Sequence, residues 1–214
     1  MTRRGEDALP ETIRFYEIAA ESLAARWADR TVMKPYLDRF AELVSPLALV
    51  VDLGCGAGHD CQELVTRGLR VIGVDSSFAL LRIGVARYPA LDFARQDLRR
   101  LAFRSGSLDG IWACASLVHM PRRQIRSVLS EIRRVLRPGG VLFTSMQGGR
   151  GQALVEDQEH GTGLRRLYVY YEAPQWHSLL DEVGFALLEA RLDYVAAGLD
   201  PGAKYWIASF ARCP

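Results

Sequence analysis

The sequence has little net charge and very few lysines. Its 27 basic and 25 acidic residues leave a formal charge of +2 at neutral pH, and Lys34 and Lys204 are the only lysines. A balance this even gives the chain no general electrostatic attraction for nucleic acid or for an anionic membrane surface. The arginines expected on a helix at 121–137 also lack the interleaved aromatic side chains that RNA recognition uses. We therefore expect neither nucleic acid nor a membrane as a partner.

The chain also has few cysteines and no long apolar run. None of its 4 cysteines forms a CxxC pair or lies in a His-rich segment, so neither a metal site nor a disulfide framework is indicated. No apolar stretch approaches the roughly 18–20 residues needed to cross a bilayer. Residues 1–21 are charged and lack the apolar core of a signal peptide, which predicts a cytoplasmic location. With 49% hydrophobic content, residues 1–214 are expected to form one domain.

Short aliphatic runs alternate with helical patterns through the middle of the chain. The expected strands are 47–53, 69–75, 91–97, 108–115 and 138–146, and the helices between them are 59–68, 78–88 and 121–136. Strands that alternate with helices at this spacing indicate a parallel sheet with helices on both faces.

The C-terminal part departs from that alternation. After a helix expected at 173–184, the strands at 185–195 and 205–212 are separated by only about nine residues, whereas a parallel crossover needs a dozen or more. These two strands should therefore be antiparallel. The expected fold is α/β and doubly wound, with a mostly parallel seven-stranded sheet and an antiparallel C-terminal hairpin strand.

A cluster of glycines follows the first expected strand. Gly54, Gly56 and Gly58 lie at the first strand-to-helix turn, where open α/β sheets bind ligands at the carboxyl edge. An ordinary tight turn would explain the glycines alone. However, Asp75 ends the second strand, where a carboxylate can accept hydrogen bonds from both ribose hydroxyls, and Asp97 ends the third. The sequence thus predicts a nucleoside-containing ligand.

The glycine loop differs from the dinucleotide-binding fingerprint. His59 stands where G-x-G-x-x-G has its third glycine. Asp52 adds negative charge near the expected pyrophosphate position, which disfavours a dinucleotide and favours a ligand with a sulfonium and an ammonium. A nicotinamide-dependent oxidoreductase remains an alternative, and so does a non-catalytic cofactor-binding module.

Several segments resemble one enzyme family: VVDLGCGAGHD, VIGVDSS, ARQDLRRLAF, SLDGIWACASLVHMP, LRPGGVLFTS and YYEAPQWHSLLDEVGF. From about residue 12 to 212, the chain resembles the class I S-adenosylmethionine-dependent methyltransferases of the small-molecule type. The resemblance implies an enzyme with S-adenosylmethionine as cofactor, which transfers a methyl group to a small molecule by in-line displacement. It leaves open whether the acceptor atom is oxygen, nitrogen, sulfur or carbon.

The resemblance also implies which residues bind the cofactor. The methionyl amine and carboxylate would be held by Asp52 and by the backbone of Gly54, Cys55 and Gly56. Asp75 would accept hydrogen bonds from the ribose hydroxyls. The rest of the implied set lies around the adenosine and beneath the methionine portion: Ser76, Gln96, Asp97, Leu98, and Cys114 or Ala115. Asp97 would accept from the exocyclic amine of adenine. Cys55 is equally well explained as a small buried packing residue.

Two segments are expected beside the acceptor. Residues 1–45 would form a helical lid over the core at 46–214, with Tyr16 on an amphipathic helix at 14–27 either facing the methionine moiety or packed beneath the helix. Residues 147–167 form an unusually long expected loop on the substrate side. The candidate substrate-binding residues here are Arg165, Arg166 and Tyr171. The two arginines could bind an acidic group of the substrate or could simply be solvated, and Tyr171 could line the pocket or belong to the core.

Histidine is the candidate for a general base. His119 follows the fourth expected strand, in a loop that would face the transferred methyl group, and imidazole titrates near neutral pH. A hydrogen-bonded structural histidine is the alternative. His59 is expected to start a helix, and His160 and His177 are expected at the surface.

Overall fold

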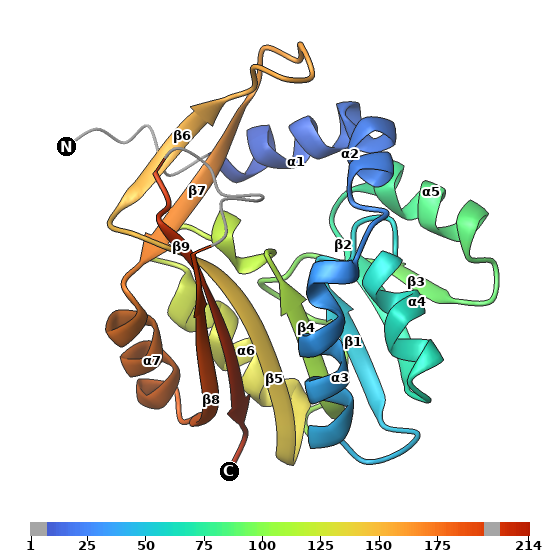
Figure 1. The fold of residues 1–214 in the computed structure, drawn as a ribbon, viewed down its shortest axis with the longest axis vertical. Coiled ribbons are helices and arrows are strands. Elements are labelled where there is room, and N and C mark those ends of the chain that lie inside the picture. Colours follow the sequence, from blue (N-terminus) through green and yellow to red (C-terminus); the bar gives the residue numbers. More distant parts are fainter. Residues whose placement is uncertain (1–7, 195–201) are drawn as a thin grey trace.

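The computed structural model describes residues 8–194 and 202–214, and its centre is a parallel sheet (Figure 1). Five parallel strands lie in the order β3-β2-β1-β4-β5. Their bounds are Leu49–Leu53 (β1), Arg70–Asp75 (β2), Asp92–Arg95 (β3), Leu108–Cys114 (β4) and Leu136–Gly148 (β5). The helices between them are α4 (His59–Thr66), α5 (Phe78–Arg87) and α6 (Ile125–Val135). The predicted alternation of strands and helices is confirmed.

The other edge of the sheet is antiparallel, as predicted. After α7 (Ala173–Glu182), β8 (Ala186–Asp193) pairs antiparallel with β9 (Tyr205–Arg212). β9 also runs antiparallel to β5, from the Val141–Arg212 pair to the Gly148–Tyr205 pair. The connection at 195–201 lies outside the described residues. Strand β9 therefore inserts between β5 and β8, and the seven predicted strands are all present.

The segment expected to be a long loop is largely a hairpin. β6 (Gln152–Glu156) pairs antiparallel with β7 (Arg165–Tyr171). β7 also continues the main sheet, because its last two residues pair with the end of β5. In Figure 1 the hairpin extends beyond the carboxyl end of the central strands. The loop expectation was wrong, because the aromatic and β-branched residues of LYVYY favour a strand, and this segment pairs with both β6 and the end of β5.

The N-terminal segment crosses the carboxyl edge as two helices. One helix was expected at 14–27, but the chain forms α1 (Ala8–Ile18) and α2 (Ala20–Arg26), separated at Ala19. Figure 1 shows α1 beside β7 and α2 near α5, above the ends of the strands. A short 3-10 turn at 31–33 and α3 (Lys34–Leu43) then lead back to the sheet.

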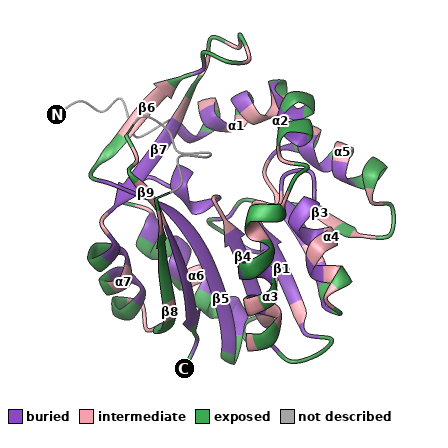
Figure 2. Ribbon diagram, viewed as in Figure 1, coloured by how far each residue is buried: buried purple, intermediate pink, exposed green. Residues whose placement is uncertain are grey.

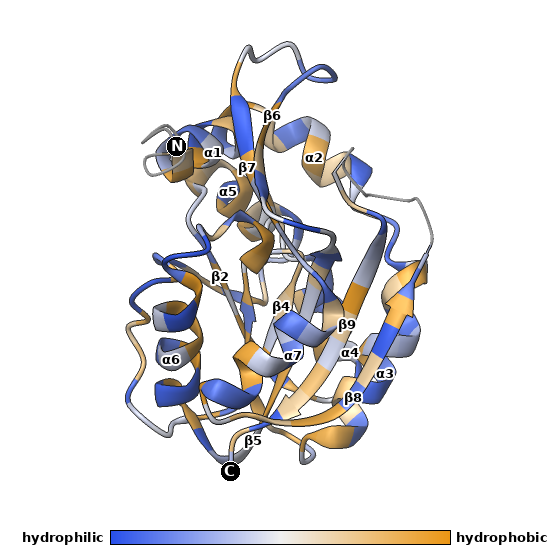
Figure 3. Cartoon of the chain, turned by 90° about the vertical axis from the view of Figure 1, so that its left-hand side faces the viewer, coloured by the Kyte–Doolittle hydropathy of each residue, from blue (hydrophilic) through white to orange (hydrophobic). Residues whose placement is uncertain are grey.

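The core lies on both faces of the central strands. On one face, α6 and α7 pack with apolar side chains such as Leu129, Ile132 and Trp176, all fully buried. On the other, Trp112 stacks on Phe143 with ring centroids 3.9 Å apart, against α3 and α4. Figure 2 shows β1, β4 and β5 as largely buried, and Figure 3 shows hydrophobic residues concentrated in the strands. In the described part of the chain, every helix is too short or too polar to span a bilayer.

Candidate cofactor and acceptor site

The glycine loop after β1 has a backbone that favours glycine. Gly54, Gly56 and Gly58 have φ of +79°, +55° and +79°. A Cβ on Gly54 would lie 2.3 Å from Cβ of Ser116, and one on Gly58 would lie 2.6 Å from Cζ of Phe93. Gly56 is different, because its Cβ would meet only the Trp27 ring at 3.7 Å. Close approach therefore restricts positions 54 and 58, whereas at 56 the backbone conformation alone favours glycine.

Asp75 lies directly beside this loop, as the predicted ribose-binding role requires. Its carboxylate accepts hydrogen bonds from the backbone N–H of Gly56 and of Ser77, both at 2.8 Å. Burial raises the pKa of this carboxyl, and the backbone bonds oppose that effect. A carboxylate has about four acceptor positions, so two remain for a diol. The structure thus places Asp75 directly beside the glycine loop.

Buried carboxylates outnumber buried cations behind the loop. The carboxylate of Asp60 accepts two hydrogen bonds from Arg30, at 2.5 and 2.6 Å, and one from Nε1 of Trp112 at 2.9 Å. Burial raises the pKa of Asp52 well above its usual value, and the nearby Asp60 and Asp75 add to this rise while Arg30 opposes it. A cationic ligand bound nearby would oppose this rise and favour the ionised form of Asp52. No pattern in the sequence predicts the Arg30–Asp60 pair, which joins residues 30 positions apart.

The end of β4 carries backbone strain and an unsatisfied hydroxyl. Ala115 has φ of +52°, uncommon for a residue other than glycine, and its N–H donates to Oγ of Ser145 at 2.8 Å. Next to it, Oγ of Ser116 is buried without a hydrogen-bond partner in the described structure. Such strain and orphaned polar atoms cluster at ligand sites. Ser116 was not among the residues predicted from the sequence, and its contact with Gly54 is visible only in the fold.

The cysteines near the loop are thiols, and burial keeps two of them protonated. Burial raises the pKa of both Cys55 and Cys114 to about 11, so neither is a thiolate at neutral pH. Cys61 donates its S–H to the carboxylate of Asp52 at 3.2 Å. All four cysteines are free, and the described residues hold no cluster of His, Cys, Asp and Glu suited to a metal ion.

The residues predicted around the adenine lie together at the end of β3. Ser76 donates its hydroxyl to the backbone carbonyl of Gln96 at 3.0 Å, and Leu98 is buried. The carboxylate of Asp97, however, is exposed and accepts two bonds from Nε of Arg99, at 2.9 and 3.0 Å, and one from Nη2 at 2.6 Å. Hydrogen bonding to Arg99 lowers the pKa of Asp97. An adenine amine at Asp97 would have to share the carboxylate with this arginine.

Tyr16 and His119, predicted separately, are hydrogen-bonded to each other. The phenol oxygen of Tyr16 is 2.6 Å from Nε2 of His119, and Nδ1 of His119 is 2.7 Å from the carbonyl oxygen of Leu167. Because a carbonyl only accepts, Nδ1 carries the proton and Nε2 accepts from the Tyr16 hydroxyl. Burial lowers the pKa of His119 to about 4, so its imidazole is neutral at pH 7. This pair joins α1, the turn after β4, and β7.

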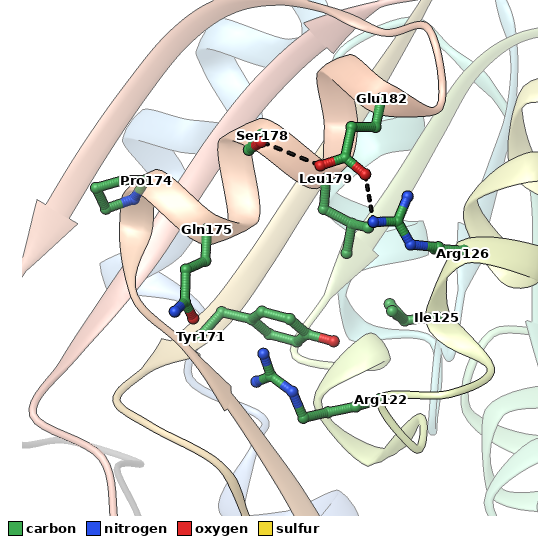
Figure 4. Close-up of a pocket in the computed structure, with 9 residues that line it drawn as sticks. All are labelled: Arg122, Ile125, Arg126, Tyr171, Pro174, Gln175, Ser178, Leu179 and Glu182. Carbon is green, nitrogen blue, oxygen red and sulfur yellow. Dashed lines mark hydrogen bonds and ion pairs between the residues drawn. The ribbon is translucent and has the colours of Figure 1, made fainter.

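The three candidate substrate residues have different surroundings. The guanidinium of Arg165 pairs with Glu11 at 3.0 Å on the surface, whereas that of Arg166 lies over the Phe15 ring, 4.3 Å from its centroid. Tyr171 lines a cavity of about 460 Å³ between α6 and α7, with the guanidinium of Arg122 4.1 Å from its ring centroid (Figure 4). Of the three, Arg166 is thus the one beside the Tyr16–His119 pair.

The other histidines have structural partners. His59 begins α4, as predicted, and bonds to the carbonyl oxygen of Ala24 in α2 at 2.8 Å. The surface position expected for His160 is wrong, because only 7% of its side chain is exposed and it bonds to Asp157. His177 is partly exposed and lies 3.2 Å from Oγ of Ser209.

The strand order, the glycine loop with its acidic partner and the antiparallel β9 define a class I methyltransferase fold. Residues 50–140 match a family model described as a methyltransferase domain. The comparisons support a class I S-adenosylmethionine-dependent methyltransferase, as the sequence resemblance predicted, with S-adenosylmethionine as its cofactor.

Individual relatives match only in part. The trans-aconitate 2-methyltransferase of Azoarcus sp. (strain BH72) is 42% identical over 101 residues, which cover 46% of this chain and 39% of that protein. A sterol 24-C-methyltransferase of Gibberella zeae is 33% identical over 179 residues, covering 76% and 46% of the two chains. The chain thus spans less than half the length of these curated relatives.

A solved structure matches nearly the whole fold. The 1,6-didemethyltoxoflavin-N1-methyltransferase of Burkholderia thailandensis, bound to 1,6-didemethyltoxoflavin and S-adenosylhomocysteine, has a TM-score of 0.77. The match covers 99% of this chain and 91% of that chain, at 19% sequence identity. At this identity the similarity establishes the fold and carries no information about the acceptor.

Proposed function

We propose that the chain catalyses S-adenosylmethionine-dependent methyl transfer to a small-molecule acceptor by in-line displacement. The observation that carries the proposal is the carboxyl edge itself, where Asp75 bonds to the backbone of Gly56 and keeps acceptor positions for a ribose. The surplus of buried carboxylates behind it suits a cationic cofactor. When bound, the cofactor supplies a methyl group already activated by a sulfonium.

The residues of this chain then have to bind, align and exclude water. We propose that the backbone of Gly54, Cys55 and Gly56 holds the methionyl group, with Asp52 contributing negative charge. Asp75 would hold the ribose, and the strained end of β4 at Ala115 would lie beneath the methionine portion. Helices α1 and α2 would act as the lid, because they cross the carboxyl edge and bring Tyr16 to it. Alignment in a dry site supplies much of the rate acceleration for such a displacement.

His119 is better suited to positioning than to proton removal. With a pKa of about 4 and its Nε2 already accepting from Tyr16, the imidazole is a weak base at neutral pH. Its two hydrogen bonds join α1 to β7 across the site. We therefore propose that His119 fixes the lid and the hairpin, in place of the general-base role expected from the sequence.

Calorimetry followed by a labelling experiment tests this function. S-adenosylhomocysteine should bind to the wild-type protein, and labelled S-adenosylmethionine should pass its methyl group to a component of a metabolite extract. NADH is the control ligand and should not bind. Binding of NADH without binding of S-adenosylhomocysteine would favour the oxidoreductase alternative, whereas cofactor binding without turnover of any extract component would favour a non-catalytic module.

A further inference from the structure

Arg165 and Arg166 are neighbours on β7 with opposite surroundings. The guanidinium of Arg165 is paired with the carboxylate of Glu11, to which its backbone N–H also donates a hydrogen bond at 3.0 Å. The guanidinium of Arg166 lies between two rings, 4.3 Å from the centroid of Phe15 and 5.3 Å from that of Tyr168. Its Nε is buried without a hydrogen-bond partner, and no carboxylate of the described residues forms an ion pair with it.

Arg166 also lies close to the polar pair on the acceptor side. Its charge contributes, after burial, to the low pKa of His119, and it opposes the rise that burial causes in the pKa of Tyr16. The two rings beside Arg166 also contact this pair, with centroids 5.3 Å apart for Phe15 and Tyr16 and 4.9 Å apart for Tyr168 and His119. A half-buried guanidinium without an anion is unusual, because buried charges in proteins are normally paired.

We infer that Arg166 binds a carboxylate of the methyl acceptor, and that the acceptor is therefore a small carboxylic acid. This inference rests on the proposed function. The planar guanidinium matches a carboxylate with two parallel hydrogen bonds, and the rings of Phe15 and Tyr168 hold its plane and exclude water. Arg165 cannot take this role without breaking its pair with Glu11.

The state of His119 agrees with an acidic acceptor. A neutral imidazole with an occupied Nε2 offers no base at pH 7, and an acceptor that is ionised there needs none. A carboxylic acid meets this condition and also supplies the anion that Arg166 lacks. A carboxylate on the acceptor thus accounts both for the Arg166 guanidinium that lacks an anion and for the neutral imidazole of His119.

Binding measurements on the protein saturated with S-adenosylhomocysteine test the inference. The probes are trans-aconitate, its uncharged trimethyl ester, and a panel of mono-, di- and tricarboxylic acids. At least one acid should bind to the wild-type protein, and its neutral ester should bind about 10- to 100-fold more weakly. Arg166→Met, which keeps the apolar stem, should lose affinity by the same factor, and Arg166→Lys should recover only part of it because it lacks the fork.

The neighbouring Arg165→Met is the matched comparison, since it removes the same atoms from a residue already paired with Glu11. It should change acid affinity much less than Arg166→Met. Equal losses would show a general effect of charge and would overturn the inference. The inference would also be overturned if none of the acids bound, or if phosphate esters bound more tightly than the acids and this binding depended on Arg166. Circular dichroism and unchanged affinity for S-adenosylhomocysteine would show that each variant is folded.

A labelling experiment separates failure of this inference from failure of the proposed function. A metabolite extract is first separated on an anion exchanger, and each fraction is then incubated with the protein and labelled S-adenosylmethionine. Label should be incorporated in the retained, anionic fraction, and Arg166→Met should deplete that label. Label in the neutral fraction alone would overturn the carboxylate inference and leave the methyltransferase function standing. No cofactor binding and no label in either fraction would reject the proposed function itself.

Discussion

The two halves of the carboxyl edge are held together by different kinds of contact. On the cofactor half, the loop after β1 bonds through backbone N–H of Gly56 to Asp75, which ends the adjacent strand. On the acceptor half, Tyr16, His119 and Leu167 come from three distant segments and meet mainly through side chains. Residues 16 and 119 are 103 positions apart, whereas 56 and 75 are only 19 apart.

This difference determines how each half should respond to mutation. In the cofactor half there is no space for a Cβ at Gly54 or Gly58, where it would lie 2.3 Å from Ser116 and 2.6 Å from Phe93. In the acceptor half, single hydrogen bonds can be removed without steric conflict, and their effects should depend on protonation. Variants of the first half should therefore abolish binding, and variants of the second should shift stability and specificity by smaller amounts.

The largest effect is expected at Gly54. Gly54→Ala places a methyl group against Ser116 in a backbone with φ of +79°, so binding of S-adenosylhomocysteine should be lost. Gly68→Ala is the matched control, because Gly68 has φ of +80° with nothing within 4 Å. It should cost only about 1–2 kcal/mol of stability and keep the affinity. Similar calorimetric affinities for both variants would reduce the loop to a simple turn.

Asp75→Ala should have the next largest effect. Loss of two charge-assisted bonds to the ribose, each worth about 1.5–3 kcal/mol, predicts ~10²- to 10⁴-fold weaker cofactor binding. Asp97→Ala is the comparison, because Asp97 is exposed and already bonded to Arg99, and we expect a much smaller loss. Calorimetry on the folded variants measures both. An unchanged affinity for Asp75→Ala would remove this residue from the site.

A pH-dependent effect is expected from His119. Its pKa is lowered to about 4 in the folded protein, so between pH 6.5 and 4 the unfolded chain binds the proton and the native state does not. The free energy of unfolding should therefore decrease as the pH is lowered from 6.5 to 4, by roughly 3 kcal/mol from this group. Urea unfolding of the wild type and of His119→Gln at several pH values isolates the contribution. Parallel pH profiles for the two proteins would contradict the neutral, buried state of His119.

Tyr16→Phe should have the smallest effect. It removes one hydrogen bond to His119 and leaves Nε2 unpaired, which predicts a stability loss of about 1 kcal/mol. Turnover per folded molecule should fall by less than about tenfold if the pair only positions the lid. A fall of ~10²-fold or more at unchanged stability would instead assign a proton-transfer role to Tyr16 and His119.

Helix and strand positions near the glycine loop followed from local patterns in the chain. The expected strand at 69–75 differs from β2 by a single residue, and the expected helix at 59–68 from α4 only at its end. Prediction failed where packing decided the outcome. The helix expected at 14–27 starts earlier and breaks at Ala19 over the strand ends. In the segment expected to be a loop, β7 pairs with both β6 and the end of β5.

The glycine loop, the acidic residue that ends β2 and the antiparallel last strand could all be predicted from the sequence. These depend on backbone conformation and on the length of connections, which are local properties of a chain. Tertiary packing, in contrast, makes Arg166 half-buried and leaves its neighbour Arg165 exposed. Successive residues of a strand point to opposite faces, but the packing of α1 on β7 fixes which face receives Phe15 and which receives Glu11. That choice leaves Arg166 without an anion beside Tyr16 and His119.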